Sequence, residues 1–254
     1  MEAKNLERLV NLMSSKFSTT IRINDRKSDI DINFPVPLQL NSNYNYEIGL
    51  QWFSAYNTIF NIKDKNEIEV TDLNRNKKIA VLIEPGAYEI SQINKRISKF
   101  LFEALNIQDD KSPITLSPDI PTSRSILNVS DNYKIEFKTI EVRDLLGFSK
   151  SIFQKGIHFS DKIINISDIN SINIQCDIIE GSYNNGNQTN NLYSFPIDTV
   201  PRGARIIERM YIPIYMPIIK KYIDSIHIRI VDEHDNLIDF HGETIQMSLH
   251  IKQV

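Results

Sequence analysis

The stretch Tyr222–Lys252, YIDSIHIRIVDEHDNLIDFHGETIQMSLHIK, decides the fold class of this chain. Apolar residues alternate with polar ones in both of its arms; they are Ile226, Ile228, Ile230, Ile245, Met247, Leu249 and Ile251. A period of two indicates β-strands with one buried face. The polar residues 232–236 between the arms are typical of a turn, so we expect an antiparallel hairpin. The sequence therefore predicts an antiparallel β protein.

The composition is that of a globular protein without a strong charge bias. The chain has 254 residues, of which 41% are hydrophobic and 24% are charged, and its net charge is -3. This is enough for one large all-β domain or two small ones, and it gives no general attraction to nucleic acid or anionic membranes. The single cysteine, Cys176, excludes an internal disulfide framework. Since no apolar run reaches the ~20 residues of a membrane span and no signal peptide is recognisable, we expect a soluble protein made in the cytoplasm.

Residues 1–17 have the period of an amphipathic helix. Its apolar stripe consists of Leu6, Leu9, Val10, Met13 and Phe17. Two interpretations remain open. The helix packs on its own domain, or it is an arm that docks on a neighbouring subunit. In the second case Leu6, Leu9, Val10 and Met13 belong to the subunit interface.

Residues 18–254 read as one jelly-roll domain built from many short strands. The clearest strand is 44–52, in which we expect five large residues on one buried face, namely Tyr44, Tyr46, Ile48, Leu50 and Trp52. Further strands are expected at 19–23, 30–34, 58–62, 67–71, 78–83, 126–129, 133–137, 172–178, 192–200 and 205–215. Pro35 and Pro37 exclude a central position for the strand that precedes them.

A helical insertion is expected at residues 85–125. Apolar residues recur at helical spacing over about 89–105, with Ser91 as a candidate N-cap. The segment 109–125 contains three prolines and reads as a loop, and 142–148 reads as one helical turn closed by Gly147. Many short antiparallel strands close into a sandwich or barrel. The length best fits a single jelly-roll sandwich of two antiparallel sheets.

Residues that would carry catalysis are sparse. The five histidines include no His-x-His pair and the eight glycines form no phosphate-binding loop. His227 and His250 are expected on the solvent face of the hairpin. Two ordinary exposed histidines are a simpler interpretation of this pair than a metal site. We therefore expect no cofactor and no metal, and a protein that is not an enzyme.

Two segments are candidates for interactions. Arg202, Arg205 and Arg209 form the one basic cluster, which pairs with carboxylates of a neighbouring subunit, contacts encapsidated DNA, or is a solvated face. The polar loop 181–191 is expected to be exposed, with Tyr183, Asn184 and Asn185 as its candidate binding residues.

Four motifs, in this order, resemble those of a known family. They are Phe34–Leu38 with Tyr44–Trp52, Pro85–Ile90 heading the helix, Leu145–Phe148, and Ile228–Gly242 with Leu249–Lys252. Together they are similar to the minor capsid (penton) proteins of Polinton/Maverick elements and adintovirus-like viruses. The resemblance covers roughly residues 30 to 252.

This resemblance implies a single jelly roll whose pentamers occupy the fivefold vertices of an icosahedral shell. The partner would be a double-jelly-roll major capsid protein, and the location would be the virion capsid after synthesis in the host cytoplasm. The alternative is a jelly-roll binding module that recognises a glycan or a receptor through the 181–191 loop.

Overall fold

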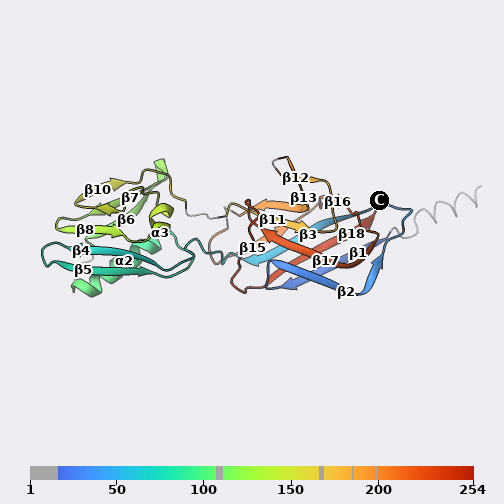
Figure 1. The fold of residues 1–254 in the computed structure, drawn as a ribbon, viewed down its shortest axis with the longest axis horizontal. Helices are drawn as coiled ribbons and strands as arrows, with labels where there is room; N and C mark the ends of the chain where they lie inside the picture. Colours follow the sequence, from blue (N-terminus) through green and yellow to red (C-terminus); the bar gives the residue numbers. More distant parts are fainter. Residues whose placement is uncertain (1–16, 107–110, 166–168, 185, 198–199) are drawn as a thin grey trace, which may run out of the picture. The chain divides into compact units, whose positions relative to one another are not determined.

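The structure is a computed structural model that describes residues 17–106, 111–165, 169–184, 186–197 and 200–254. The chain divides into two compact units, one of Met1–Ile59 with Ile169–Val254 and one of Phe60–Asp168 (Figure 1). Each unit has a hydrophobic core of its own. We call them the jelly-roll unit and the insert unit.

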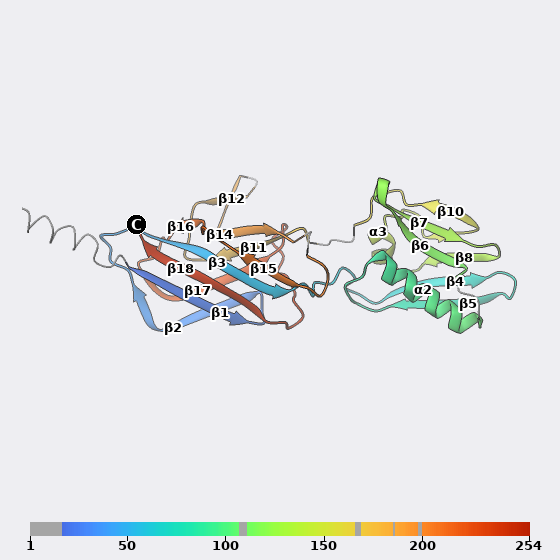
Figure 2. The ribbon, with the colours of Figure 1, turned by 180° about the vertical axis from the view of Figure 1, so that it is seen from behind.

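The jelly-roll unit contains two antiparallel sheets. The first has the order β1 (Ser18–Asp25), β18 (Ile245–Gln253), β3 (Tyr46–Tyr56) and β15 (Arg205–Arg209), with β16 (Tyr215–Pro217) also paired to β3. The second has the order β14 (Asn191–Pro196), β11 (Ser171–Cys176), β17 (Tyr222–Val231) and β2 (Asp29–Gln39). Figure 2 shows the C-terminal strand β18 beside β3, which is far away in sequence. The chain crosses between the sheets from β1 to β2 to β3 to β11, from β14 to β15, and from β16 to β17 to β18, which is the jelly-roll topology.

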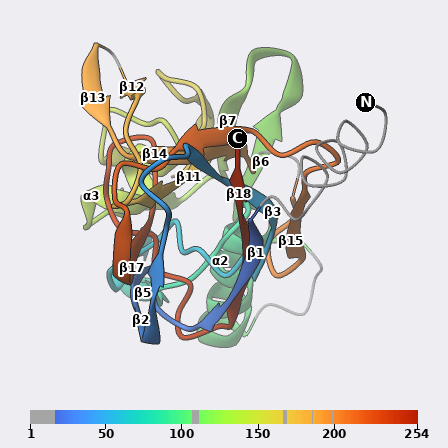
Figure 3. The same cartoon turned by 90° about the vertical axis from the view of Figure 1, so that its right-hand side faces the viewer.

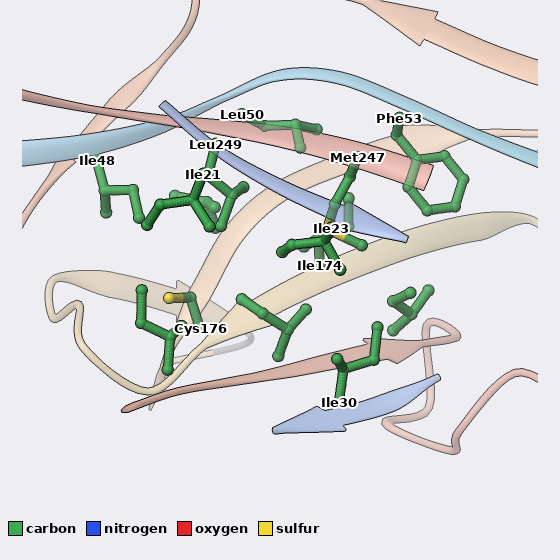
Figure 4. Packing of buried hydrophobic residues seen from close by; sticks show 14 of the residues in the cluster. Ile21, Ile23, Ile30, Ile48, Leu50, Phe53, Ile174, Cys176, Met247 and Leu249 are labelled. Carbon is green, nitrogen blue, oxygen red and sulfur yellow. The ribbon is translucent and has the colours of Figure 1, made fainter. Parts of the chain in front are cut away.

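The core lies between these two sheets, which face each other as layers (Figure 3). The predicted buried faces of β17 and β18 are buried, including Ile228 and Ile230 from one layer and Met247 and Leu249 from the other. The prediction is wrong for Tyr44, which precedes β3 and is 47% exposed. Figure 4 shows side chains of both layers pointing toward each other, with Phe53 among them. The predicted all-β jelly-roll sandwich is therefore confirmed.

The predicted C-terminal hairpin is wrong. The two strands are present, but β17 pairs with β2 and β11, whereas β18 pairs with β1 and β3. The connection between them crosses from one sheet to the other, so their apolar faces look at each other across the core. Alternation identifies a buried face but not the strand that pairs beside it.

Strand β2 follows the expectation for its prolines. It pairs only with β17 and so forms an edge of its sheet. Its register is regular at Asn33 and again at Leu38, with an irregularity in the segment that contains Pro35 and Pro37. A proline cannot donate to the ladder, and an edge strand with a bulge tolerates it.

The insert unit is a second β structure rather than a single helix and loop. One sheet has the order β5 (Lys77–Ile83), β4 (Asn66–Asp72), β8 (Tyr133–Phe137) and β9 (Ile152–Phe153). Another has the order β10 (Gly156–Phe159), β7 (Arg124–Val129) and β6 (Ile114–Asp119). Short strands β12 (Ser182–Asn184) and β13 (Asn187–Thr189) belong to the jelly-roll unit.

Helix α2 (Ile90–Leu105) confirms the predicted helix and lies along the insert's strand β5 (Figure 2). Its apolar stripe is buried, and the Asn94 side chain accepts a hydrogen bond from the Leu116 amide of β6 at 2.7 Å. The expected N-cap at Ser91 is wrong. The helix begins after Glu89, whose amide donates to the Gln92 side chain at 2.9 Å.

The extent of the insertion differs from the expected 85–125. The inserted unit spans residues 60–168, so the segment 18–254 is not one jelly-roll domain with a helical loop. Segment 109–125, expected to be a loop, contains β6, where Ile114 and Leu116 are buried. Pro118 is tolerated there because β6 is an edge strand.

No strand is present at 58–62, where one was expected; only an isolated bridge joins Ile62 to Gly86. In this segment the Asn61 side chain makes hydrogen bonds to the backbone of Tyr88. Its amide donates to the Tyr88 carbonyl at 2.7 Å and its oxygen accepts from the Tyr88 amide at 2.8 Å. The chain leaves the jelly-roll unit here and enters the insert unit.

We expect Gly147→Ala to destabilise the insert unit by more than about 2 kcal/mol. Gly147 ends helix α3 (Ile140–Leu145) as predicted, with φ at 80°, and a Cβ there would lie 2.4 Å from the Lys162 carbonyl oxygen. Gly203→Ala is the matched control, since its φ is 75° but nothing lies within 4 Å of the added carbon. Thermal unfolding by circular dichroism measures both. Equal losses would contradict the steric account.

Candidate interaction surfaces

The outward face of the first sheet carries the only tryptophan of the chain. Trp52 was expected in the core with Leu50, and this prediction is wrong. A β-bulge shifts the register between the Ser248–Trp52 and Leu249–Leu50 pairs, which turns Phe53 inward and Trp52 outward. The adjacent Trp52 and Phe53 were the available signal, because neighbours on a strand cannot share a face.

A hollow of about 630 Å³ lies beside Trp52. It is lined by Gln51, Trp52, Ser54, Arg205, Ile207, Arg209, Met210, Tyr211 and Gln246. Ile207 is 52% exposed, and in the segment after β15 Tyr211 and Ile212 are 103% and 87% exposed. Reading residues 205–215 as one strand missed this apolar surface, because β15 ends at Arg209 and the chain then leaves the sheet.

The three arginines of the candidate interface lie in different settings. Arg202 donates to the Ile59 carbonyl at 2.5 Å. Arg205 donates to the Ser54 hydroxyl at 2.7 Å and to the Gln246 side chain at 3.0 Å. Arg209 is exposed, and among the described residues its guanidinium has no partner. Arg205 and Arg209 share the Trp52 face, so two of the three are brought together; their role at an interface stays a prediction.

The candidate arm residues Leu6, Leu9, Val10 and Met13 lie outside the described residues, and their role stays a prediction. The last residue of that stripe, Phe17, precedes β1 and its ring meets Tyr46 edge-on with centroids 5.6 Å apart.

A groove of about 890 Å³ lies on the outward side of the second sheet. The predicted exposed loop forms its wall as the hairpin of β12 and β13, in which Tyr183 is 70% exposed and Asn184 is exposed too. Asn185 lies outside the described residues. The floor comes from outward side chains of β11 and β17, including Asn173, Gln175 and Arg229.

The floor of this groove is held by its own hydrogen bonds. Gln175 donates to the Asp235 carboxylate at 2.6 Å and accepts from Arg229 at 2.9 Å. Burial acts to raise the pKa of Asp232, but hydrogen bonds from Asn236 and the His234 amide outweigh it, so this pKa is lowered. The groove is therefore a rigid, polar surface that offers amides and carboxylates.

The histidines do not form a site. His227 and His250 were expected to face each other on one hairpin, and they instead belong to strands of different sheets. His227 bonds Asp29, and His250 bonds the hydroxyls of Ser18 and Tyr215. Within the described ranges, no three His, Cys, Asp or Glu side chains converge as metal ligands would.

We expect the Cys176 thiol to resist alkylation at pH 8 in the native protein. The residue is 1% exposed in the core, as predicted, and burial raises the pKa of its thiol to about 12. The reactive thiolate is then scarce as well as shielded. Timed labelling with iodoacetamide, followed by mass spectrometry, measures this against a urea-unfolded sample that labels fully. Rapid labelling of native protein would contradict the burial.

None of the helices in the described ranges has both the length and the hydrophobicity of a membrane span. No protein-family model and no curated protein matches the chain. The crystal structure of the selenomethionine-labelled mavirus penton protein matches with a TM-score of 0.51 and 12% identity, over 94% of this chain and 100% of that one. The D2–D3 domains of the Escherichia coli flagellar cap protein FliD also align, over 93% of this chain and 100% of theirs, at 11% identity and with a TM-score of 0.18. The chain therefore has a penton-like jelly-roll fold.

Proposed function

We propose that this protein is a structural capsid subunit that forms pentamers at the fivefold vertices of an icosahedral shell. The observation that carries this is the fold match to the mavirus penton protein, which extends over 94% of the chain and so includes both the jelly-roll unit and residues of the insert unit. Its partners would be further copies of itself and a double-jelly-roll major capsid protein, and it would reside in the virion.

The surfaces of the jelly-roll unit support such a role. A ring of five is a head-to-tail assembly, in which each copy offers two unlike surfaces. The Trp52 face is partly apolar and basic, whereas the groove face is polar and rich in carboxylates. The protein would act through these contacts and without chemistry of its own, and it would not be an enzyme.

Native mass spectrometry of the full-length protein tests the proposal. We expect a species of five times the 29.4 kDa chain, and more of it when major capsid protein is added. A strict monomer at high concentration, with and without that partner, would contradict the vertex role. Titration with DNA in the same experiment tests the separate prediction that the basic cluster contacts encapsidated DNA.

The groove supports a second candidate function, recognition of a glycan or receptor. Its size of about 890 Å³ and its lining of amides and hydroxyls suit a hydroxyl-rich ligand, and Tyr183 offers a ring for stacking. A glycan array with the wild-type protein and the Tyr183→Ala variant tests this. Binding that the variant loses would support recognition, and an array without hits would contradict the glycan form of the proposal.

A further inference from the structure

The first outward surface of the jelly-roll unit is apolar and positively charged. One row of the sheet pairs Arg22 with Ser248, Ser248 with Trp52, and Trp52 with Arg209. Both arginines are exposed, and neither has a partner among the described residues. The carboxylate of Glu47 on this face is already paired with Lys252 at 3.4 Å. We call this the basic face.

The opposite outward surface carries the opposite charge. Asp29 and Asp31 are exposed on strand β2, and Asp235 lies in the turn after β17. The His227 ring bonds Asp29, and an Arg229 nitrogen lies 3.4 Å from the Asp235 carboxylate. Asp31 is exposed and has no partner among the described residues. Asp31 is therefore the carboxylate of this strand that is free to meet an arginine of another copy. We call this the acidic face.

Both faces also present exposed apolar side chains. Ile207 and Tyr211 on the basic face are 52% and 103% exposed, and Val36 of β2 and Tyr222 of β17, the strands that pair at the acidic face, are 78% and 57% exposed. Large exposed apolar residues next to arginine and tryptophan are typical of protein interfaces. Figure 3 shows β15, which bears Ile207, and β2 on opposite sides of the jelly-roll unit.

We propose that the basic face of one copy packs on the acidic face of the next copy and that this contact builds the ring. The inference rests on the proposed capsid function and names its subunit interface, with Trp52, Ile207 and Arg209 on one side and Asp31 and Val36 on the other. Unlike surfaces on opposite sides of a subunit produce head-to-tail contacts. Such contacts form a closed ring when a whole number of equal rotations, one per copy, completes a full turn. Unlike charges also exclude a like-to-like pairing of two basic faces.

A second copy fits the basic face better than DNA does. Phosphate contacts depend on many lysines and arginines, and an exposed isoleucine side chain adds nothing to them. The hollow beside Trp52 instead offers a pocket of about 630 Å³ that an apolar side chain of another protein can fill. The excess negative charge of the chain, -3 overall, points the same way.

Charge reversal in the full-length protein tests the inference. The variant Arg22→Glu with Arg209→Glu makes the basic face acidic, and Asp29→Lys with Asp31→Lys makes the acidic face basic. We expect each double variant to associate roughly tenfold or more weakly than wild type, because like charges then meet. The quadruple variant restores opposite charges and is expected to recover most of the association. Sedimentation velocity measures all four proteins.

The matched control reverses two exposed basic residues of the insert unit, Arg124→Glu and Lys150→Glu, and should leave association unchanged. Trp52→Ala should weaken it without unfolding the protein, as circular dichroism checks. The proposed interface would be wrong if the charge-reversed variants formed rings as the wild type does, or if the quadruple variant associated no more strongly than the double variants. Either result would leave the proposed capsid function in place. Loss of DNA binding without any change in association would assign the basic face to DNA. A monomeric wild type would instead contradict the proposed function itself.

Discussion

Replacing Phe53 by alanine is expected to lower the free energy of unfolding of the jelly-roll unit by about 3–5 kcal/mol. The Phe53 side chain has no exposed surface, and its ring centroid lies 5.4 Å from that of Phe195 and 6.5 Å from that of Phe240. Phe195 belongs to β14 in the opposite sheet, so Phe53 joins the two layers. Its removal leaves a cavity that rigid neighbouring strands cannot fill.

Trp52→Ala is the control for this prediction, since it removes a larger ring from the next position. Trp52 points outward because of the bulge in β3, and we expect its loss to cost about 1 kcal/mol, the typical cost of a single substitution. Urea unfolding followed by circular dichroism compares the two variants. A larger loss at Trp52 than at Phe53 would mean that the bulge is misplaced.

We expect residues 60–168 to fold when they are produced alone, and the remaining chain to fold when a flexible linker of roughly ten residues replaces them. The two units share no sheet, and each buries its own set of apolar residues. Because stability arises mainly from such buried surface, neither core depends on the other.

Calorimetry of the full chain should then show two transitions, and each separate piece should show one. Phe53→Ala should lower the temperature of only the transition that belongs to the jelly-roll unit. A single cooperative transition in the full chain, together with an insoluble insert, would contradict the independence of the two units.

Much of the fold could be predicted from side-chain alternation. A buried strand face leaves a period of two in the sequence, as at Ile226–Ile230, and the helix over 90–105 leaves its own period. The motifs Pro85–Ile90 and Leu145–Phe148 contributed to the family resemblance, which implies the same jelly roll that the strand pattern and chain length predict. These signals are local, and each depends only on neighbouring residues.

The rest depends on contacts between distant residues. The residues of β18 do not indicate that it pairs with β1 and β3. Two alternating segments joined by a turn were therefore interpreted as a hairpin. The bulge at Trp52 reverses the inward face within one strand. The insert was underestimated because its strands β4 and β8 belong to a separate core, whereas alternation alone does not assign a strand to a core.

The candidate surfaces, like the fold, could be predicted only in part from the sequence. The cluster Arg202–Arg209 and the loop 181–191 stand out by composition, and the structure shows two of the arginines beside the Trp52 hollow and the loop beside a groove. Trp52 and Tyr211 were not predicted to be there, because their outward position follows from the bulge and from the end of β15.

Electron microscopy of the purified full-length protein tests the central claim most directly. Class averages of single particles report the number of copies and their symmetry without any assumption about the interface. We predict closed rings with fivefold symmetry in which the jelly-roll units touch side by side. Particles of another symmetry, or single copies at every concentration, would contradict a protein built to occupy a capsid vertex.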